Sequence, residues 1–254
     1  MSVLLVDIGN TRVKWARLGS RGPGRPHAAV HVGWSARDFE RFVFRDAEGI
    51  ERVLVSNVAG EQVARHLTAA ARRRLGIRAE LVRSVRSAGG VTTRYAEPWR
   101  LGVDRFVAAI GAHDLVGARA ACVISVGTAV TLDLVDAAGV HRGGAIVPGP
   151  RLMIESLLHN TDGIGKRARG DRRRSRGLFA RGTREAIEQG ARHAVAAVID
   201  RFVAEARAEL GTRPVVLLTG GAAPEIRPLL RTRCRDVPDL VLRGLAVLAR
   251  SETR

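Results

Sequence analysis

Residues 3–18 read VLLVDIGNTRVKWARL, and this stretch decides the fold. Its apolar run from Val3 to Val6 predicts a buried strand, because a short apolar segment bounded by turn residues is typical of one. The turn at residues 7–11 is polar and contains a glycine, and residues 12–18 predict a strand that returns along the first. The stretch therefore predicts a β-hairpin with a polar, glycine-containing turn.

The same pattern recurs 118 residues later, where residues 122–135 read CVISVGTAVTLDLV. A strand, a turn and a return strand follow in the same order, and Gly9 aligns with Gly127. A single Gly-Thr pair carries no information. Two such hairpins half a chain apart predict two domains of similar fold.

Both halves continue with alternating strand-like and helical segments. This alternation predicts an α/β fold with mixed sheets. We place the boundary near residue 116, which gives expected domains of residues 1–116 and 117–254. The expected strands are residues 53–56, 80–85 and 214–218, and the expected helices are residues 61–75, about 104–115 and a long helix capped by Thr183.

The composition is that of a folded cationic protein. The chain has 254 residues, of which 42 are basic and 25 acidic, so its formal net charge is +17. Because 46% of the residues are hydrophobic, a disordered polycation is excluded. The two cysteines, Cys122 and Cys234, exclude a disulfide framework and a CxxC metal site. The apolar N-terminal run is too short for a signal peptide, and no segment approaches the ~20 apolar residues of a membrane span. We therefore expect a cytoplasmic protein with no membrane partner.

Almost all of the positive charge is arginine, since Lys14 and Lys166 are the only lysines. GC-rich codon usage produces this bias when arginine replaces lysine on a solvated surface. The alternative is a field that attracts anions such as nucleotides, acidic metabolites or nucleic acid. The run from Lys166 to Arg176 is either solvated surface or a flap near a bound phosphate. It has no interleaved aromatic residues to stack on bases, which argues against a nucleic-acid partner.

The first turn has residues suited to binding a phosphate. Gly9 allows close approach of the backbone, and Asn10, Thr11 and exposed N–H groups can donate hydrogen bonds to phosphate oxygens. Lys14 remains a lysine in a chain where almost every other basic residue is arginine. This indicates that the position requires the compact point charge of an ammonium group. Asp7, at the end of the strand, can hold a hydrated Mg²⁺. The alternative is an ordinary hairpin turn, in which Gly, Asn and Asp are common.

The second turn supplies Gly127 and the hydroxyls of Thr128 and Thr131, with Asp133 at alternate spacing. Two such turns facing each other across a cleft between the domains would bind one polyphosphate. Gly220-Gly221 ends a predicted strand and opens a helix, where a base or ribose can lie against bare backbone. Helix N-termini and close-packed turns explain this glycine pair equally well.

Taken in order, these motifs resemble those of type III pantothenate kinases and of the related Bvg accessory factor proteins. The family belongs to the superfamily of acetate kinases, sugar kinases, Hsp70 and actin. The resemblance therefore implies two related ribonuclease H-like (actin-like ATPase) domains with mixed sheets flanked by helices, and it spans nearly the whole chain. The motifs are Asp7–Thr11 with Lys14, Gly102–Arg105, Gly127–Asp133, Gly143–Gly149, Thr183 with Gly190, Gly220-Gly221 and Leu242–Leu245.

The resemblance implies ATP-dependent phosphorylation of pantothenate at the start of coenzyme A synthesis, with Mg²⁺ on the nucleotide. Asp104 would be the general base that orients the primary hydroxyl of pantothenate and takes its proton late, because a carboxylate of ordinary pKa near 4 cannot deprotonate an alcohol in advance. We choose Asp7 rather than Asp133 as the magnesium-side carboxylate, because it ends the first strand at the phosphate turn. By position, the ATP-binding residues would be Asp7, Ile8, Gly9, Asn10, Thr11, Arg12, Val13, Lys14 and Thr128, and the substrate-binding residues Tyr95, Gly102, Val103, Asp104, Arg105 and Thr183.

Two of these residues have structural alternatives. Aspartate is among the best N-cap residues, so Asp104 can cap the helix that follows it. Thr183 is placed to cap the long helix, with Glu185 in its first turn.

One position departs from the family pattern. Many members carry an aspartate two residues before the second glycine that ligates K⁺ or NH₄⁺, and this chain has Ser125 there. A hydroxyl can coordinate K⁺ but supplies no charge, so dependence on a monovalent cation stays open. The resemblance also implies a homodimer whose second subunit helps to close the substrate pocket. Two other functions stay open: a Bvg accessory factor-like regulatory protein with weak or no kinase activity, and a kinase of the same fold for another small hydroxy acid.

Overall fold

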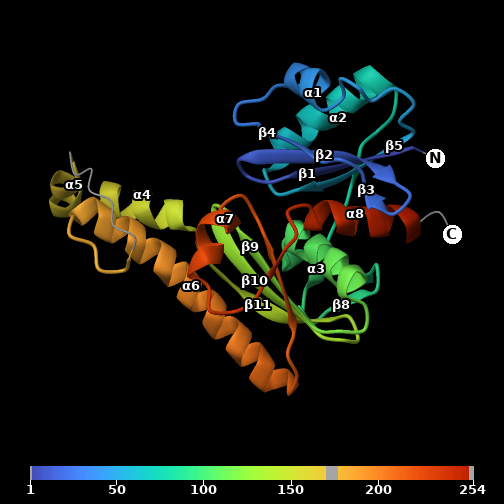
Figure 1. Cartoon of the computed structure of the whole chain (residues 1–254). Helices are drawn as coiled ribbons and strands as arrows, with labels where there is room; N and C mark the ends of the chain where they lie inside the picture. Colours follow the sequence, from blue (N-terminus) through green and yellow to red (C-terminus); the bar gives the residue numbers. More distant parts are fainter. Residues whose placement is uncertain (1, 170–176, 252–254) are drawn as a thin grey trace. The chain divides into compact units, whose positions relative to one another are not determined.

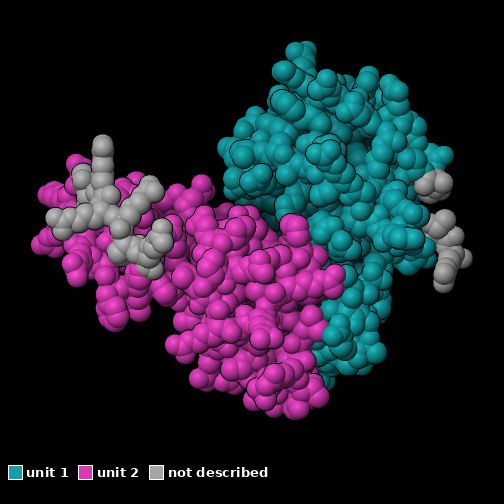
Figure 2. Space-filling model, in the orientation of Figure 1, with its two compact units in different colours: residues 1–120, 135–143, 239–254 teal, residues 121–134, 144–238 magenta. Residues whose placement is uncertain are grey.

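The computed structural model describes residues 2–169 and 177–251, and the chain divides into two compact units (Figures 1 and 2). Unit 1 comprises Met1–Ala120, Val135–Gly143 and Asp239–Arg254, and unit 2 comprises Ala121–Leu134 and Gly144–Pro238. The expected division was a single linear boundary, whereas the chain passes between these units several times. The assignment of residues 1–116 and 117–254 to two related domains stays a prediction.

The sheet of unit 1 is mixed and centred on β1. Strand β2 runs antiparallel to β1 on one side, and β5 runs parallel to it on the other. Helices lie on both faces of this sheet (Figure 1), which is why β1 is buried along most of its length. The order is β3-β2-β1-β5-β6, with β4 paired to β2, and the strands are β1 (Val3–Ile8), β2 (Arg12–Gly19), β3 (Gly22–Pro23), β4 (His27–Val30), β5 (Arg52–Asn57) and β6 (Glu80–Leu81).

One face of this sheet packs against α1 (Ala36–Phe42) and α2 (Glu61–Leu75). The buried side chains of Val6, Ile8 and Val13 form a core with residues of both helices. Helix α2 buries residues three and four positions apart, as an amphipathic helix does, and it ends at Gly76 in the left-handed region, with φ +72°.

The other face packs against α3 (Val103–Val116) and α8 (Leu240–Ser251). These two helices cross at glycines. A Cβ at Gly111 would lie 2.5 Å from the carbonyl oxygen of Leu240, and one at Gly244 would lie 1.9 Å from that of Val107. Only glycine allows so close an approach of the two backbones, so the crossing fixes the position of α3.

Unit 1 also contains the short strands β7 (Ser87–Ala88) and β8 (Val91–Thr93), which pair antiparallel. Strand β8 pairs in parallel with the first residues of β11 (Val140–Pro148). A single 3₁₀ turn, η1 (Pro98–Arg100), then leads into α3. This segment carries Tyr95 and Gly102 of the predicted site.

Unit 2 is built around β9 (Ala121–Val126) and β10 (Ala129–Val135), which are joined by a two-residue turn. Strand β11 continues the sheet beyond β10, while β12 pairs in parallel with β9 on the other side. Val195 and Ile199 of α6 pack against the buried side chains of the sheet. The remaining bounds in unit 2 are α4 (Pro150–Asn160), α5 (Asp162–Ala168), α6 (Thr183–Leu210), β12 (Val215–Thr219), α7 (Ala223–Ile226), η2 (Arg227–Leu229) and β13 (Arg235–Asp236).

Most of the expected elements are confirmed: β5 and β12 among the strands, and α2, α3 and α6 among the helices. The strand expected at residues 80–85 is wrong beyond Leu81. Leu81 and Val85 are exposed, so this apolar pattern buries no face. The basic run from Lys166 begins in the last turn of α5, and residues 170–176 lie outside the described residues. Among the helices that the structure describes, none is both long and apolar enough to cross a membrane.

Candidate active site

Asp7 lies in a row of polar side chains that crosses the unit 1 sheet. In the strand register, Asp7 faces Lys14 of β2 on one side and Ser56 of β5 on the other. Residues directly opposite one another in adjacent strands share a face of the sheet. Since Val6, Ile8 and Val13 point into the core beneath α1 and α2, the alternation of β1 and β2 turns Asp7 and Lys14 toward α3 and α8.

Asp7 has a strongly perturbed carboxyl group. Burial is the largest cause and raises the pKa of Asp7 from its ordinary 3.8 to about 7. The charge of Lys14 lowers this pKa, the charge of Asp104 raises it, and a hydrogen bond from Ser56 lowers it. The Ser56 hydroxyl is buried and has no hydrogen bond of ordinary geometry to any described residue, so its effect on Asp7 is weak. A carboxylate poised near neutral pH beside a second carboxylate is typical of a functional site.

Asp104 lies in the first turn of α3. The N-cap of this helix is Gly102, so the alternative in which Asp104 caps the helix is wrong. Its Oδ1 instead accepts a hydrogen bond from the backbone N–H of Arg105, at 2.9 Å. The carboxylate therefore lies at the positive end of the helix dipole, where a negative charge is stabilised. The charge of Asp104 raises the pKa of Asp7, and α3, which carries Asp104, packs against the face of the sheet to which Asp7 belongs.

Arg105 and Tyr95 form a second pair in unit 1. Arg105 is 6% exposed, and its Nη1 donates a hydrogen bond to the Tyr95 hydroxyl, at 3.1 Å. The guanidinium carbon lies 5.9 Å from the centre of the Tyr95 ring, and that ring contacts His141 at 5.8 Å between ring centres. The structure thus joins the predicted substrate-binding residues Tyr95 and Arg105, which sequence spacing alone left apart.

Two supports of Tyr95 have no signal in the sequence. Arg86 donates hydrogen bonds to three carbonyl oxygens around it, those of Thr93 at 2.9 Å, Tyr95 at 2.7 Å and Ala96 at 2.8 Å. His141 is fully buried, and its Nδ1 lies 3.4 Å from the Thr93 hydroxyl. The His141 contact depends on strand pairing between distant parts of the chain, and the Arg86 contacts depend on how residues 86–96 fold back, so no motif indicated either of them.

The turn that follows β1 has several of its backbone polar groups hydrogen-bonded within unit 1. Gly9 donates its N–H to the Arg12 carbonyl oxygen at 2.9 Å, and a Cβ at Gly9 would make an ordinary contact of 3.4 Å with that oxygen. Asn10 and Arg12 are exposed. The side chains of Ile8 and Val13, both predicted to bind ATP, are fully buried in the core, so only their backbone atoms are available to a ligand.

The turn that follows β9 is packed between two other glycines. A Cβ at Gly149 would lie 2.1 Å from the Gly127 carbonyl oxygen, and one at Gly220 would lie 2.2 Å from that of Val126. Gly220 also has φ +99°. The Gly220-Gly221 pair therefore has a packing role at Gly220, while a Cβ at Gly221 would meet no atom within 4 Å.

The remaining predicted residues lie in unit 2. Ser125 is half-buried and faces Thr219 of β12 in the register. Thr183 is the first residue of α6, whose N-cap is Gly182 without a side-chain cap, so the expectation that Thr183 caps this helix is wrong. Asp133 is buried. Among the described residues, no group of three or more His, Cys, Asp or Glu side chains is placed to hold a metal ion.

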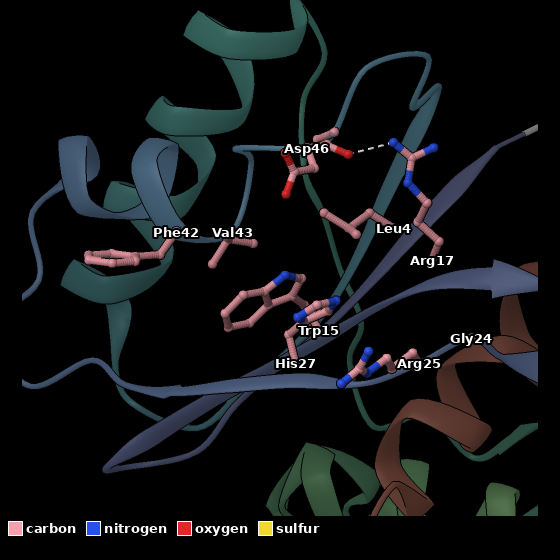
Figure 3. A pocket seen from close by; sticks show the side chains of 10 residues that line it. Leu4, Trp15, Arg17, Gly24, Arg25, His27, Phe42, Val43 and Asp46 are labelled. Carbon is pink, nitrogen blue, oxygen red and sulfur yellow. Dashed lines mark hydrogen bonds between the residues drawn. The ribbon is translucent and has the colours of Figure 1, made fainter.

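A cavity of about 280 Å³ lies elsewhere in unit 1 (Figure 3). Trp15 and Phe42 line it, and Arg17 closes one side by donating hydrogen bonds to the carbonyl oxygens of Asp46 at 2.5 Å and Glu48 at 3.0 Å. Trp15 follows Lys14 on β2 and so points to the opposite face of the sheet. None of the predicted site residues lines this cavity.

Comparison with known proteins gives consistent matches. Residues 3–205 match the family described as type III pantothenate kinase. A type III pantothenate kinase of Nitrosococcus oceani is 34% identical over 99% of this chain and 95% of its own, and one of Herminiimonas arsenicoxydans is 40% identical over 97% of each. Among solved structures, the activator of the 2-hydroxyisocaproyl-CoA dehydratase from Clostridium difficile with bound ADPNP has a TM-score of 0.55 at 14% identity, covering 100% of this chain and 95% of its own. This last likeness concerns the fold, which is α/β of the actin-like ATPase type with two mixed sheets flanked by helices.

Proposed function

The chain belongs to the type III pantothenate kinase family, and on this premise we propose that it transfers the γ-phosphoryl group of ATP to the primary hydroxyl of pantothenate, the first step of coenzyme A biosynthesis. The observation that carries the proposal is that Asp7 and Asp104 lie on one face of the unit 1 sheet and that the charge of Asp104 raises the pKa of Asp7, although they come from a strand end and a helix start 97 residues apart. A phosphoryl transfer needs one group that orients the acceptor and another beside the phosphates, and these two residues supply them.

Asp104 acts on the acceptor. Its carboxylate accepts a hydrogen bond from the primary hydroxyl of pantothenate and so orients the oxygen toward the γ-phosphorus. The new bond forms between this oxygen and phosphorus while the bond to the β–γ bridging oxygen breaks, and ADP leaves. The hydroxyl proton passes to Asp104 late, when the attacking oxygen has become acidic, which suits a carboxylate in a loose transition state.

Asp7 acts on the phosphate side and fits Mg²⁺. Magnesium is usually held by one or two carboxylates together with water and substrate phosphates, so a single carboxylate is a sufficient protein ligand. The pKa of Asp7 is raised because burial and the charge of Asp104 destabilise its ionised form. A cation bound beside the carboxylate would stabilise that form. When bound, Mg²⁺ neutralises charge on the phosphate oxygens. Lys14 faces Asp7 and supplies a fixed positive charge for the same phosphates.

The two turns are proposed to bind ATP. At the first turn the donors are the backbone N–H groups of residues 10 and 11 and the exposed side chains of Asn10 and Arg12. At the second turn they are the backbone at Gly127 and the hydroxyl of Thr128. Small residues at both turns let phosphate oxygens approach the backbone closely.

Pantothenate is proposed to bind at the start of α3. Arg105 and Tyr95 present a guanidinium and a hydroxyl that already contact each other, and both are suitable partners for oxygen atoms of the substrate. Gly102 and Val103 form the N-terminal end of the helix beside them. Thr183 joins this set only by its match to the family motif.

Three finer points also belong to the proposal. Ser125 gives its position no carboxylate, so we propose that K⁺ or NH₄⁺ is not required. We propose a homodimer, which the family resemblance supports, as do the exposed apolar side chains of unit 2, among them Ile146 at 59% and Phe179 at 92%. Sedimentation velocity tests the dimer directly. A cytoplasmic location follows from the substrates of coenzyme A synthesis.

A coupled kinase assay tests the function, with pantothenate, sugars and acetate offered as acceptors. We expect turnover when pantothenate is the acceptor and none with sugars or acetate. Asp104→Asn should lower kcat about 10²–10⁴-fold, the usual contribution of a general base, because it removes the proton acceptor. Asp114→Asn is the matched control, since Asp114 lies exposed on the same helix. Full turnover by Asp104→Asn would remove this residue from the mechanism, and turnover with another acceptor alone would refute the proposed substrate.

A further inference from the structure

His31 contacts the first turn and belongs to no motif described above. It follows β4 and is only 3% exposed. Its Nε2 lies 2.6 Å from the carbonyl oxygen of Gly9, and its backbone N–H donates to the carbonyl oxygen of Thr11 at 3.1 Å. One residue therefore holds two of the three residues of the turn.

The chemistry of this contact fixes the tautomer of His31. A carbonyl oxygen can only accept a hydrogen bond, so Nε2 must carry the proton that it donates to Gly9. The other ring nitrogen, Nδ1, is buried and has no hydrogen-bond partner among the described residues. A protonated Nδ1 would need a partner there, so the neutral Nε2–H form fits this environment. The ring also packs edge-on against Trp34, with 6.4 Å between ring centres.

The contact also sets the direction of the turn's N–H groups. In a planar trans peptide the C=O and the following N–H point in opposite directions. Because the carbonyl of Gly9 points at His31, the N–H of Asn10 must point away from His31. The hydrogen bond from the His31 N–H to the Thr11 carbonyl oxygen orients the peptide between Thr11 and Arg12, whose N–H belongs to Arg12. The Asn10 amide belongs to the turn proposed to bind ATP, and the Arg12 amide opens β2 directly after it.

We propose that His31 is a positioning residue for ATP: its ring holds the Gly9 peptide in the orientation that presents the Asn10 N–H to the phosphates. This inference rests on the proposed function, since it gives the first turn the role of binding nucleotide. His31 does not itself touch the substrate. It acts by preventing a peptide flip that would turn a carbonyl oxygen toward the phosphates, where like charges repel.

The test compares variants that differ only in the hydrogen bond. His31→Gln keeps a donor at the position of Nε2, whereas His31→Met has a similar size and no donor. We expect the Kd for ADP with Mg²⁺, measured by calorimetry, to rise about tenfold in His31→Met, the loss expected for one buried hydrogen bond. His31→Gln should recover most of the affinity, and the KM for pantothenate should stay unchanged in both.

His66→Met is the matched control. The Nδ1 of His66 lies 2.9 Å from the carbonyl oxygen of Trp34, so its loss removes a similar bond beside His31 without touching the turn. We expect its affinity for ADP to equal that of wild type. An unchanged Kd in a folded His31→Met protein would overturn the proposal, and so would an equal loss in His66→Met.

A second measurement covers the case in which His31→Met does not fold. Nitrogen-15 NMR of the wild-type protein reports which nitrogen of His31 carries the proton. A proton on Nε2 supports the proposal, whereas a neutral ring protonated on Nδ1 contradicts it. Binding of ADP can be read without any acceptor. Failure to phosphorylate pantothenate would therefore refute the proposed function and leave the test of His31 intact.

Discussion

The two glycine turns follow equivalent strands but are held in place differently. The turn after β1 has three residues, lies next to the charged pair Asp7 and Lys14, and is held by the side chain of His31. The turn after β9 has two residues, has Ser125 at the position equivalent to Asp7, and is packed between the backbones at Gly149 and Gly220. The same sequence pattern thus forms one turn held by hydrogen bonds from His31 and one held by close backbone packing.

This difference indicates a division of roles. A turn beside a half-buried carboxylate and a lysine can respond to the charge of phosphates and a cation. A turn packed between glycines has no charge to adjust and little room to move, so it provides a fixed surface. We expect substitutions at the second turn to act mainly on stability, and those at the first to act mainly on the pH dependence of stability and on ATP binding.

The largest effect should come from Gly220→Ala. The new Cβ would lie 2.2 Å from the Val126 carbonyl oxygen, and φ +99° is unfavourable for alanine. We expect a loss of about 3 kcal/mol or more in the free energy of unfolding, or no folded protein, as for other backbone clashes. Urea denaturation measures the loss. Gly221→Ala is the control, because its Cβ meets no atom within 4 Å, and equal stability of the two variants would show that the turn is not packed as described.

Asp7→Asn should change how stability depends on pH. The pKa of Asp7 is about 7 in the folded protein and near 3.8 when unfolded, so the fold binds this proton more tightly. The stability it contributes is therefore full below pH 4 and is lost as the pH rises through 7. Asparagine does not titrate. As the pH rises from 4 to 8, the free energy of unfolding of the variant should therefore increase relative to that of wild type by a few kcal/mol, at about 1.4 kcal/mol per pKa unit.

Denaturation of both proteins across this pH range measures the difference. The same substitution should reduce kcat/KM for ATP, since it removes the magnesium-side carboxylate. Parallel pH profiles of stability for the variant and wild type would contradict the burial of an Asp7 carboxyl with a raised pKa.

The smallest effect should come from Ser125→Asp, which gives the second turn the charge that it lacks. We expect wild-type kinase activity to be the same in sodium and potassium buffers, because a hydroxyl supplies no charge to hold the ion. The variant should become severalfold more active in potassium than in sodium. Wild-type activity that is lost in sodium and restored by potassium would show that Ser125 suffices for the cation.

The sequence predicted those parts of the fold that depend on local pattern. The helix at residues 61–75 was predictable because its apolar residues recur every three or four positions and Gly76 ends it. The strand expected at residues 80–85 failed because a strand forms only where a neighbouring strand pairs with it, and β5 pairs with just Glu80 and Leu81. The capping roles expected of Asp104 and Thr183 failed because Gly102 and Gly182 precede them as N-caps.

By itself the sequence determined the two hairpins, the order of the motifs and the identity of the residues that can do chemistry, since these depend on residue type and spacing. Only the tertiary structure decided that Asp104 affects Asp7, that Arg105 reaches Tyr95 and that His31 holds Gly9. Those relations depend on burial and on distances between segments far apart in the chain. A carboxyl group has an ordinary pKa in any sequence, and it acquires an unusual one only when the fold removes its water and brings another charge near.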